Sequence, residues 1–452
     1  MQSNSWFTLS FIALLIGPVN AGVFEFASKE YGADVITHPT GYKGTGGKLI
    51  VRVGISPASP YADEMEISVQ NAIKTWNELI PTTGNVIFPS DEIPSSHYDF
   101  ESVALHELGH CMGLSHPNLG SESGLTNSNK NYTTATKGAN NQFDLNSGPD
   151  GVIGSRDDIR GDDVNLHWFY KGNNNPFVLP AIIDQTTYSQ NLADLPANDS
   201  YVANADRDVA MLFGLPKTEA VMQQGILARE ARRTLAADDV ATLRLGMSGL
   251  DLLANTADDY TVQLQYAGIT DDADIIFAFD NKSGFAACTI DAQFVGSSKS
   301  NIEVQSGRIS LNTGFSWYFN QQSTPDSGYL PEPSLSINGK KTSLAITQGA
   351  HLTLAIALNP NQSGGNPADY WVKASTPLGD YWLDDQFQFT ASATPLRAYG
   401  GPLVNIASFT LFDGSTAGLA PGVYTISFAV DGNINAIYDG TYEESITFTI
   451  NP

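Results

Sequence analysis

The sequence predicts an α+β domain, with a twisted sheet and long helices, followed by an all-β, sandwich-like region. The first part rests on one strand pattern and three helical patterns between residues 48 and 245. The second rests on residues 260–452, where short alternating runs are separated by Gly, Asn, Asp and Pro and no helical pattern remains. The 452 residues exceed what one compact core usually contains, so we expect two or three domains.

The elements of the first part follow from local patterns. Residues 48–57 form a β-branched, alternating run that ends at proline, which predicts a strand. Over 61–80 the apolar side chains fall on one helical face, and acidic side chains occupy the first turn, where they suit the helix dipole. Further helices are predicted at 101–114 and 234–245, the last with Thr234 as its N-cap.

Composition shifts suggest the domain boundaries. We assign residues 22–259 to the α+β domain, 260–335 to a β-rich domain and 336–452 to a sandwich-like domain. The boundary between the last two comes from the stretch 320–333, which is rich in Gln, Ser and Pro.

The first 21 residues are interpreted as a signal peptide. Phe7 to Ile16 is a short, mostly apolar run, and Val19-Asn20-Ala21 follows it as a small-x-small cleavage pattern. Ten residues are too few to span a bilayer. We therefore expect a secreted protein, extracellular or at the cell surface, although the first six residues contain no Lys or Arg.

The net charge of the chain limits the classes of partner that it is expected to bind. The chain has 48 Asp+Glu against 23 Lys+Arg, a formal net charge of −25. Such a chain repels nucleic acid and anionic membranes, so neither is expected as a partner. The excess carboxylates can bind divalent cations or simply form an acidic, solubilising surface.

Cysteine is scarce. An exported chain with only Cys111 and Cys288 is not held together by a disulfide framework. The two residues fall in different expected domains, so we do not expect them to pair, and Cys111 is interpreted as a buried thiol.

The strongest motif is His106-Glu-Leu-Gly-His110-Cys-Met-Gly-Leu-Ser-His116. On a helix the first two histidines lie one turn apart on the same face, where both imidazoles can bind one Zn²⁺. Glu107 adjoins them and can act as a general base without being a ligand. Gly113 lets the chain turn so that His116 becomes the third ligand, and a fourth position stays open for water.

This motif resembles the zinc signature of the metzincin metalloproteases. The approach from Tyr98 to His106 is similar to the matrixin active helix, whereas Pro117, directly after the third histidine, is more like the serralysins. The resemblance implies a metzincin-like zinc protease domain over 22–259 and a methionine turn beneath the metal. Met222 is the candidate for that turn and Met211 its rival.

Several departures accompany the resemblance. The gap between His116 and Met222 is much longer than in matrixins, which implies an insertion at about 118–215. No tyrosine ligand follows Met222, because Gln223 and Gln224 stand there. No cysteine precedes the zinc motif, so a cysteine switch is excluded.

An internal repeat suggests calcium. Residues 148–158 and 249–259 both fit Gly-x-Asp-x4-[Ser/Thr]-x-Asp-Asp, and three carboxylates within nine residues can converge on a hard cation. Acidic surface turns are the alternative. The candidate ligands are Asp144, Asn146, Asp150, Asp157 and Asp158 around the first copy, and more weakly Asp251, Asp258 and Asp259 in the second.

These observations predict a secreted zinc-dependent endopeptidase that acts on a protein or peptide substrate, with Zn²⁺ and, as a further cation, Ca²⁺. The C-terminal β-domains are expected to bind a surface or polymer. A second hypothesis is a surface-binding or adhesive β-domain protein with a vestigial zinc domain. A third is a zinc hydrolase that acts on something other than protein.

Overall fold

The chain folds into two compact units in the computed structural model, and each is described by itself. Unit 1 comprises residues 1–44, 49–253 and 262–324, and unit 2 comprises 45–48, 254–261 and 325–452. The structure describes residues 24–26, 35–116, 145–146, 159–160, 168–172, 177–189, 194, 207–212, 214–223, 225–296, 299–324 and 330–452. The expected signal peptide lies outside these residues.

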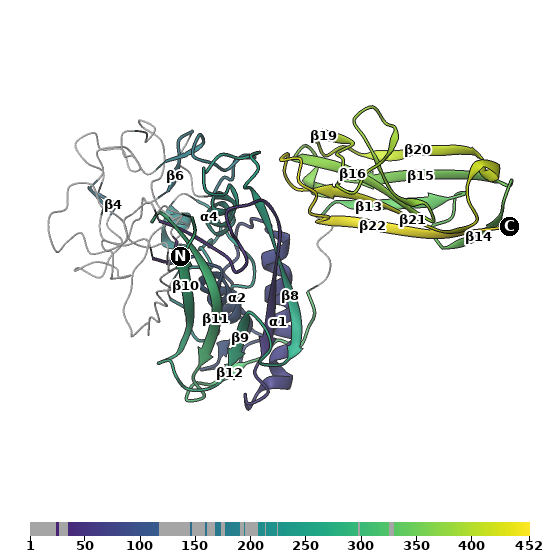
Figure 1. Cartoon of the computed structure of the whole chain (residues 1–452). Helices are drawn as coiled ribbons and strands as arrows, with labels where there is room; N and C mark the ends of the chain where they lie inside the picture. Colours follow the sequence, from purple (N-terminus) through teal and green to yellow (C-terminus); the bar gives the residue numbers. More distant parts are fainter. Residues whose placement is uncertain are drawn as a thin grey trace, which may run out of the picture. The chain divides into compact units, whose positions relative to one another are not determined.

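Unit 1 contains a six-stranded sheet in the order β1-β11-β9-β2-β8, with β10 paired to β11 (Figure 1). The pairs β1–β11, β11–β9 and β9–β2 are parallel, and β10 runs antiparallel to β11. The strands are β1 (Ile36–His38), β2 (Gly47–Ile55), β8 (Tyr260–Ile269), β9 (Ile275–Ala278), β10 (Ala286–Phe294) and β11 (Asn301–Leu311). Short pairs accompany the sheet: β3 (Tyr98–Asp99) with β12 (Trp317–Tyr318), β4 (Leu145–Asn146) with β5 (Ile159–Arg160), and β6 (Phe169–Tyr170) with β7 (Tyr188–Ser189).

The helices of unit 1 pack against each other and against the sheet. They are α1 (Ala62–Glu78), α2 (Phe100–Cys111), α3 (Arg207–Leu212) and α4 (Ala237–Met247). α2 contacts α1 as well as β10 and β11 (Figure 1). At the α1–α2 contact, the buried indole Nε1 of Trp76 donates a hydrogen bond to the carbonyl of Leu105 at 2.8 Å.

The predicted helices form with shifted ends. α2 begins one residue early because the Asp99 side chain accepts a hydrogen bond from the Ser102 N–H, as an N-cap does. α4 starts at Ala237, not at Thr234, because the Asp239 carboxylate accepts the N–H of Ala236 and fixes the first turn there. The predicted strand at 48–57 is β2.

The expected domain boundary at residue 259 is wrong. Strands β8, β9, β10 and β11 do not form a separate β-rich domain over 260–335, because they complete the sheet that β1 and β2 begin. A strand pattern shows that a segment is extended but does not show which strand it pairs with. Here β1 and β2 lie far earlier in the sequence than the strands that join them in the sheet. The break between the units falls instead at residue 325, inside the Gln/Ser/Pro-rich stretch.

The expectation that Cys111 is a buried thiol is also wrong. Cys111 and Cys288 form a disulfide, with their Cα atoms 5.8 Å apart. The pairing became possible because both residues belong to unit 1, Cys111 at the end of α2 and Cys288 on β10.

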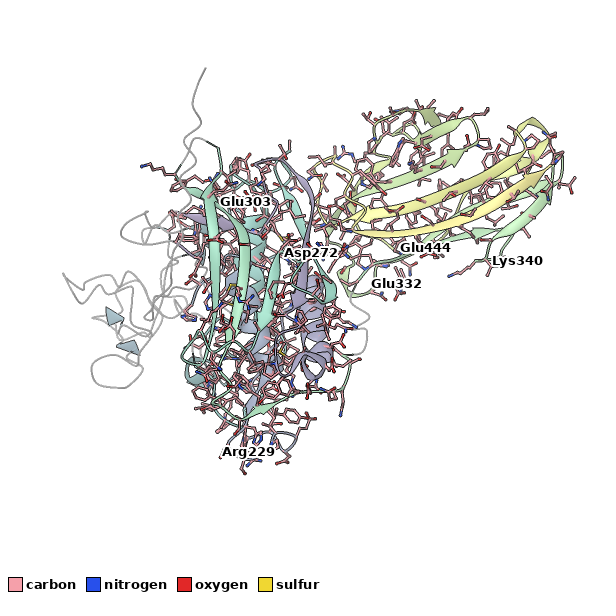
Figure 2. The ribbon with its side chains drawn as sticks, turned by 60° about the horizontal axis from the view of Figure 1, so that its bottom comes forward. Arg229, Asp272, Glu303, Glu332, Lys340 and Glu444 are labelled. Atoms are coloured by element: carbon pink, nitrogen blue, oxygen red, sulfur yellow. A yellow bond between two sulfur atoms is a disulfide. The ribbon has the colours of Figure 1, made fainter. Side chains whose placement is uncertain are left out.

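Unit 2 is a two-sheet β-sandwich with its own core, as the sequence predicts. One sheet has the order β13-β15-β20, and the other β14-β22-β21-β16-β17-β18 with β19 paired to β16. Exposed charged side chains such as Glu332, Lys340 and Glu444 cover its surface (Figure 2). The strands are β13 (Glu332–Ile337), β14 (Leu344–Thr347), β15 (His351–Asn359), β16 (Pro367–Thr376), β17 (Gly379–Leu383), β18 (Phe389–Ala391), β19 (Tyr399–Pro402), β20 (Ile406–Ser415), β21 (Gly422–Asp431) and β22 (Tyr442–Asn451).

Among the helices that the structure describes, none is both long enough and apolar enough to cross a membrane.

A buried carboxylate ties α1 and α2 to the chain after β12. Glu101 Oε2 accepts hydrogen bonds from the side-chain amides of Asn71 and Asn320, both at 2.8 Å. Burial raises the pKa of Glu101 to about 7, although these amides and the nearby Arg233 oppose the shift. The folded state therefore holds this proton more tightly than the unfolded chain does.

We predict that Phe277→Ala destabilises the whole of unit 1. Phe277 is fully buried on β9, with its ring 6.2 Å from that of Phe100 on α2. The substitution should cost about 3–5 kcal/mol. In hydrogen exchange followed by mass spectrometry, peptides from α2 and β2 should lose protection together with those from β9, while peptides from β21 keep theirs. Unchanged protection in α2 would instead support a separate domain at 260–335.

We predict that Glu101→Gln changes how stability depends on pH. In the wild type, the unfolded carboxyl loses its proton near its ordinary pKa of 4.5 while the folded one keeps its proton up to about pH 7. Stability should therefore fall as pH rises through this window, by up to about 3 kcal/mol. The variant should lack this loss in urea unfolding at pH 5 and pH 8. Parallel profiles for the two proteins would contradict the prediction.

Candidate metal centre

The zinc motif occupies the last two turns of α2 and the turn that follows. His106 and His110 are four residues apart and lie on one face of the helix. Gly113 then takes a φ of +98°, and a Cβ at this position would come within 2.8 Å of Thr37. Only glycine tolerates both the positive φ and the close approach to Thr37. The resulting turn brings His116 back to the other two histidines.

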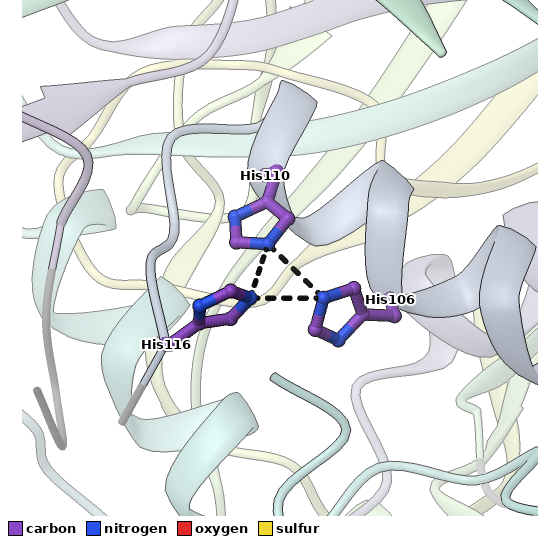
Figure 3. A group of neighbouring side chains, drawn as sticks. All are labelled: His106, His110 and His116. Atoms are coloured by element: carbon purple, nitrogen blue, oxygen red, sulfur yellow. Dashed lines mark hydrogen bonds between the residues drawn. The ribbon is translucent and has the colours of Figure 1, made fainter. Parts of the chain in front are cut away.

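The three imidazoles converge on one point. Their Nε2 atoms lie 3.1 Å (His106 to His110), 2.9 Å (His110 to His116) and 3.2 Å (His106 to His116) apart (Figure 3). Ligand atoms bound to zinc at ~2.0–2.1 Å in a tetrahedral arrangement lie about 3.3 Å from one another. Among the residues that the structure describes, this is the only group of three or more His, Cys, Asp or Glu side chains close enough to hold one metal ion.

Hydrogen bonds at the far side of two rings fix which nitrogen faces the centre. Nδ1 of His106 contacts the carbonyl oxygen of Val221 at 2.7 Å, and Nδ1 of His110 contacts that of Leu114 at 2.8 Å. A carbonyl only accepts, so each Nδ1 carries a proton, and in the neutral rings each Nε2 presents a lone pair to the other. Lone pairs 3.1 Å apart repel unless a cation lies between them, so the donor set fits a metal ion.

The pKa values of the three histidines are shifted in different directions. Burial, together with the charge of His110, lowers the pKa of His106 and His116 well below the usual value, which keeps these rings neutral. Burial also lowers the pKa of His110, but the nearby carboxylate of Glu25 and the charge of Glu107 outweigh this and raise it to about 9. A metal ion would compete with that proton.

Glu107 lies on the same helix, beside the histidines, and its side chain is buried. Burial raises its pKa, whereas the charge of His110 and a hydrogen bond from the backbone N–H of Cys288 oppose the rise. Its other carboxylate oxygen, Oε2, is buried without a hydrogen-bond partner. A buried acceptor with unused capacity next to a metal site is suited to bind a water molecule and take its proton.

Met222 packs against α2. It is buried, and its sulfur packs against Gly109, between the two helical histidines, where no Cβ would fit. Met211, the rival candidate, is 44% exposed on α3. The Asp239 carboxylate accepts the N–H groups of Val221 and Met222, so α4 fixes the turn whose carbonyl orients His106.

A buried ion-pair network supports the same turn. Glu219 and Glu230 both pair with Arg207, which lies in the expected insertion, and Glu219 also pairs with Arg232. Arg232 further donates to the carbonyl of Gly225 at 2.7 Å. Two buried acids are thus matched by two arginines, and part of the 118–215 segment contributes to the scaffold of the site.

The sequence did not reveal Glu25 as part of the site. Its Oε2 lies 3.7 Å from Nδ1 of His110, and its backbone N–H donates to the carbonyl of Gly113 at 2.7 Å. The buried side chain of Phe24 anchors this segment against Leu114. No local pattern marks a carboxylate so distant in sequence as a partner of His110, and only the folded chain brings the two together.

Among the described calcium candidates, Asp251, Asp258 and Asp259 in the second copy of the repeat are not grouped closely enough to hold one metal ion. The Asp259 carboxylate instead accepts N–H groups of its own turn, from Asn255 and Thr256. For the first copy, the backbone of Asn146 lies in β4, whereas Asp144, Asp150, Asp157 and Asp158 lie outside the described residues.

We predict that Glu25→Gln weakens metal binding. A carboxylate behind a histidine ligand raises its basicity and fixes its orientation, and loss of such a group typically costs 10–100-fold in metal affinity. Zinc affinity should be measured by competition with a chromophoric chelator. Glu64→Gln, at an exposed position on α1, is the control and should bind zinc like the wild type. Equal affinities for all three proteins would exclude a role for Glu25.

Comparisons with known proteins do not identify a family. No family model matches the chain, and no curated protein matches it. Among solved structures, Pseudomonas fluorescens alkylpurine DNA glycosylase AlkC, bound to DNA containing an abasic site analog, is similar over 27% of this chain and 31% of that protein. The identity is 11% and the TM-score 0.16, so this likeness carries no argument about fold or function.

Proposed function

We propose that this chain is a secreted zinc-dependent endopeptidase with a metzincin-like catalytic unit. The observation that carries the proposal is the convergence of three histidine Nε2 atoms beside a buried glutamate on the same helix. Three protein ligands leave a fourth position for water or substrate, which distinguishes a catalytic zinc site from a structural one.

The chain's own donors favour zinc. Neutral imidazole nitrogens in a compact, three-sided arrangement suit Zn²⁺ better than the hard cations, which prefer oxygen. A zinc ion held in this way supplies Lewis acidity, which makes a water molecule acidic near neutral pH and polarises a carbonyl group. His106, His110 and His116 would hold it, with Val221 and Leu114 fixing the orientation of two rings.

Glu107 is the general base in this proposal. Its unpartnered Oε2 accepts the proton of the attacking water, and its raised pKa makes it a stronger base than an exposed carboxylate. The protonated side chain then returns the proton to the leaving amine. The Cys288 N–H holds the other oxygen, so the carboxylate keeps its position while the proton moves.

Strand β10 supports a polypeptide substrate. Among the strands that the structure describes, it pairs only with β11, so its other side is an edge. An extended peptide can add to such an edge through backbone hydrogen bonds. Because Cys288 lies on β10 and contacts Glu107, a peptide added there would lie close to the general base.

The disulfide supports export. Disulfides form and persist in oxidising compartments and are rare in the cytosol of most organisms. The bond between Cys111 and Cys288 therefore agrees with the signal-peptide interpretation of residues 1–21.

Unit 2 supports an accompanying binding function. Phe387 is 53% and Phe409 44% exposed on the sandwich, with ring centroids 6.0 Å apart. Exposed aromatic rings at this spacing can contact a surface or polymer. If the zinc unit were vestigial, this binding would be the main function, and the following experiment separates the two cases.

We predict that Glu107→Gln abolishes proteolysis without removing the metal. Glutamine keeps the shape of the side chain but cannot take a proton, so kcat/KM should fall by roughly 10²–10⁴-fold. Casein zymography and a peptide library would measure activity, and metal analysis should find one zinc per chain in both proteins. A wild type that binds zinc but cleaves neither protein nor peptide would refute the proposal and favour a binding protein.

A further inference from the structure

The disulfide lies on the same side of α2 as the general base. Cys111 follows Glu107 by four residues, so the two side chains lie one turn apart on a common helix face. Cys288 contacts both: its sulfur is bonded to Cys111, and its backbone N–H donates to the Glu107 carboxylate. One residue of β10 thus holds two successive turns of the helix.

The sheet is shaped to allow this close approach. Gly307 on β11 faces the disulfide, and a Cβ at this position would lie 2.8 Å from the sulfur of Cys111 and 3.2 Å from its Cβ. Cys111 is only 1% exposed, so it has little room to move aside. Any larger residue at 307 would therefore push the end of α2 away from β10.

We propose that Cys288 is a positioning residue for the Glu107 carboxylate, held in place by its disulfide to Cys111. The disulfide keeps β10 against α2, and the backbone N–H of Cys288 then fixes one carboxylate oxygen while Oε2 remains available to water. This inference rests on the proposed peptidase function.

The role is separate from metal binding. His106 and His110 are oriented by the carbonyls of Val221 and Leu114, and neither contact involves β10. Glutamate is a flexible side chain with several rotatable bonds, and loss of its anchor spreads the carboxylate over several positions. A misplacement of about 1 Å in a reacting group can cost up to 10²-fold in rate. The loss should therefore appear in kcat and not in zinc affinity.

The test compares the full-length wild type with the double variant Cys111→Ala/Cys288→Ala, each loaded with zinc. Val51→Ala, in the core of β2, is a matched control that lowers the stability of unit 1 without touching the link. Four quantities are measured: kcat, KM, zinc affinity, and the hydrogen-exchange rate of the backbone amide at residue 288. The amide remains in the double variant, so its exchange reports the contact with Glu107 directly.

We expect the double variant to show a kcat roughly 10-fold to 100-fold lower, with KM and zinc affinity within about 2-fold of the wild type. Its amide at residue 288 should exchange at least 10-fold faster, and Val51→Ala should show neither change. A folded double variant with wild-type kcat and wild-type exchange would overturn the proposal and leave the disulfide as a stabilising cross-link only.

Gly307→Ala tests the proposal even if the double variant does not fold. This variant keeps both cysteines, and its added methyl group pushes on Cys111, so kcat should fall and amide exchange should rise while mass spectrometry still finds the disulfide. Wild-type values for both would also overturn the proposal. A wild type without peptidase activity would refute the enzyme function, whereas the exchange rates would still decide whether the disulfide holds the contact.

Discussion

The close packing of α2 is the constraint on which the rest of unit 1 depends. The helix is held so tightly that two contacts require glycine: Gly109 of the helix against Met222, and Gly307 of β11 against Cys111. On a third side the Trp76 indole is hydrogen-bonded to Leu105. A helix fixed on three sides cannot rotate, and so its histidines face one centre without help from a ligand. The convergence of the three histidines is a consequence of this packing.

The buried carboxylates differ in how completely their hydrogen-bonding capacity is used. Asp239 accepts three backbone N–H groups, and Glu101 accepts two side-chain amides. Glu219 is matched by arginines. In Glu107, by contrast, only one oxygen has a hydrogen-bond partner. Unsatisfied buried acceptors are costly, so a protein retains one where its function uses it. This contrast separates Glu107 from Asp239, Glu101 and Glu219, which a sequence motif alone cannot do.

Local features of the structure were predictable and long-range ones were not. The apolar face of α1, the turn at Gly113 and the grouping of three histidines all follow from spacing within one segment. The partners of Cys111 and the role of Glu25 depend on segments far apart in the sequence. The strand patterns after residue 260 were recognised, but strand patterns do not specify which sheet they join. The calcium repeat likewise fixes only the spacing of its carboxylates, and in the second copy Asp259 uses its carboxylate to accept N–H groups of its own turn.

The site is assembled from the full extent of unit 1. Glu25 contributes near one end of the described chain, α2 contributes the ligands, the turn at Met222 contributes the floor, and β10 contributes Cys288. β2 pairs with β9 across the intervening helices, and the contacts that Glu25 and Cys288 make with α2 likewise join segments far apart in the sequence. The disulfide links two such segments, the end of α2 and strand β10. The full geometry of the candidate site, with Glu25, Met222 and Cys288 around α2, is therefore present only in the folded unit.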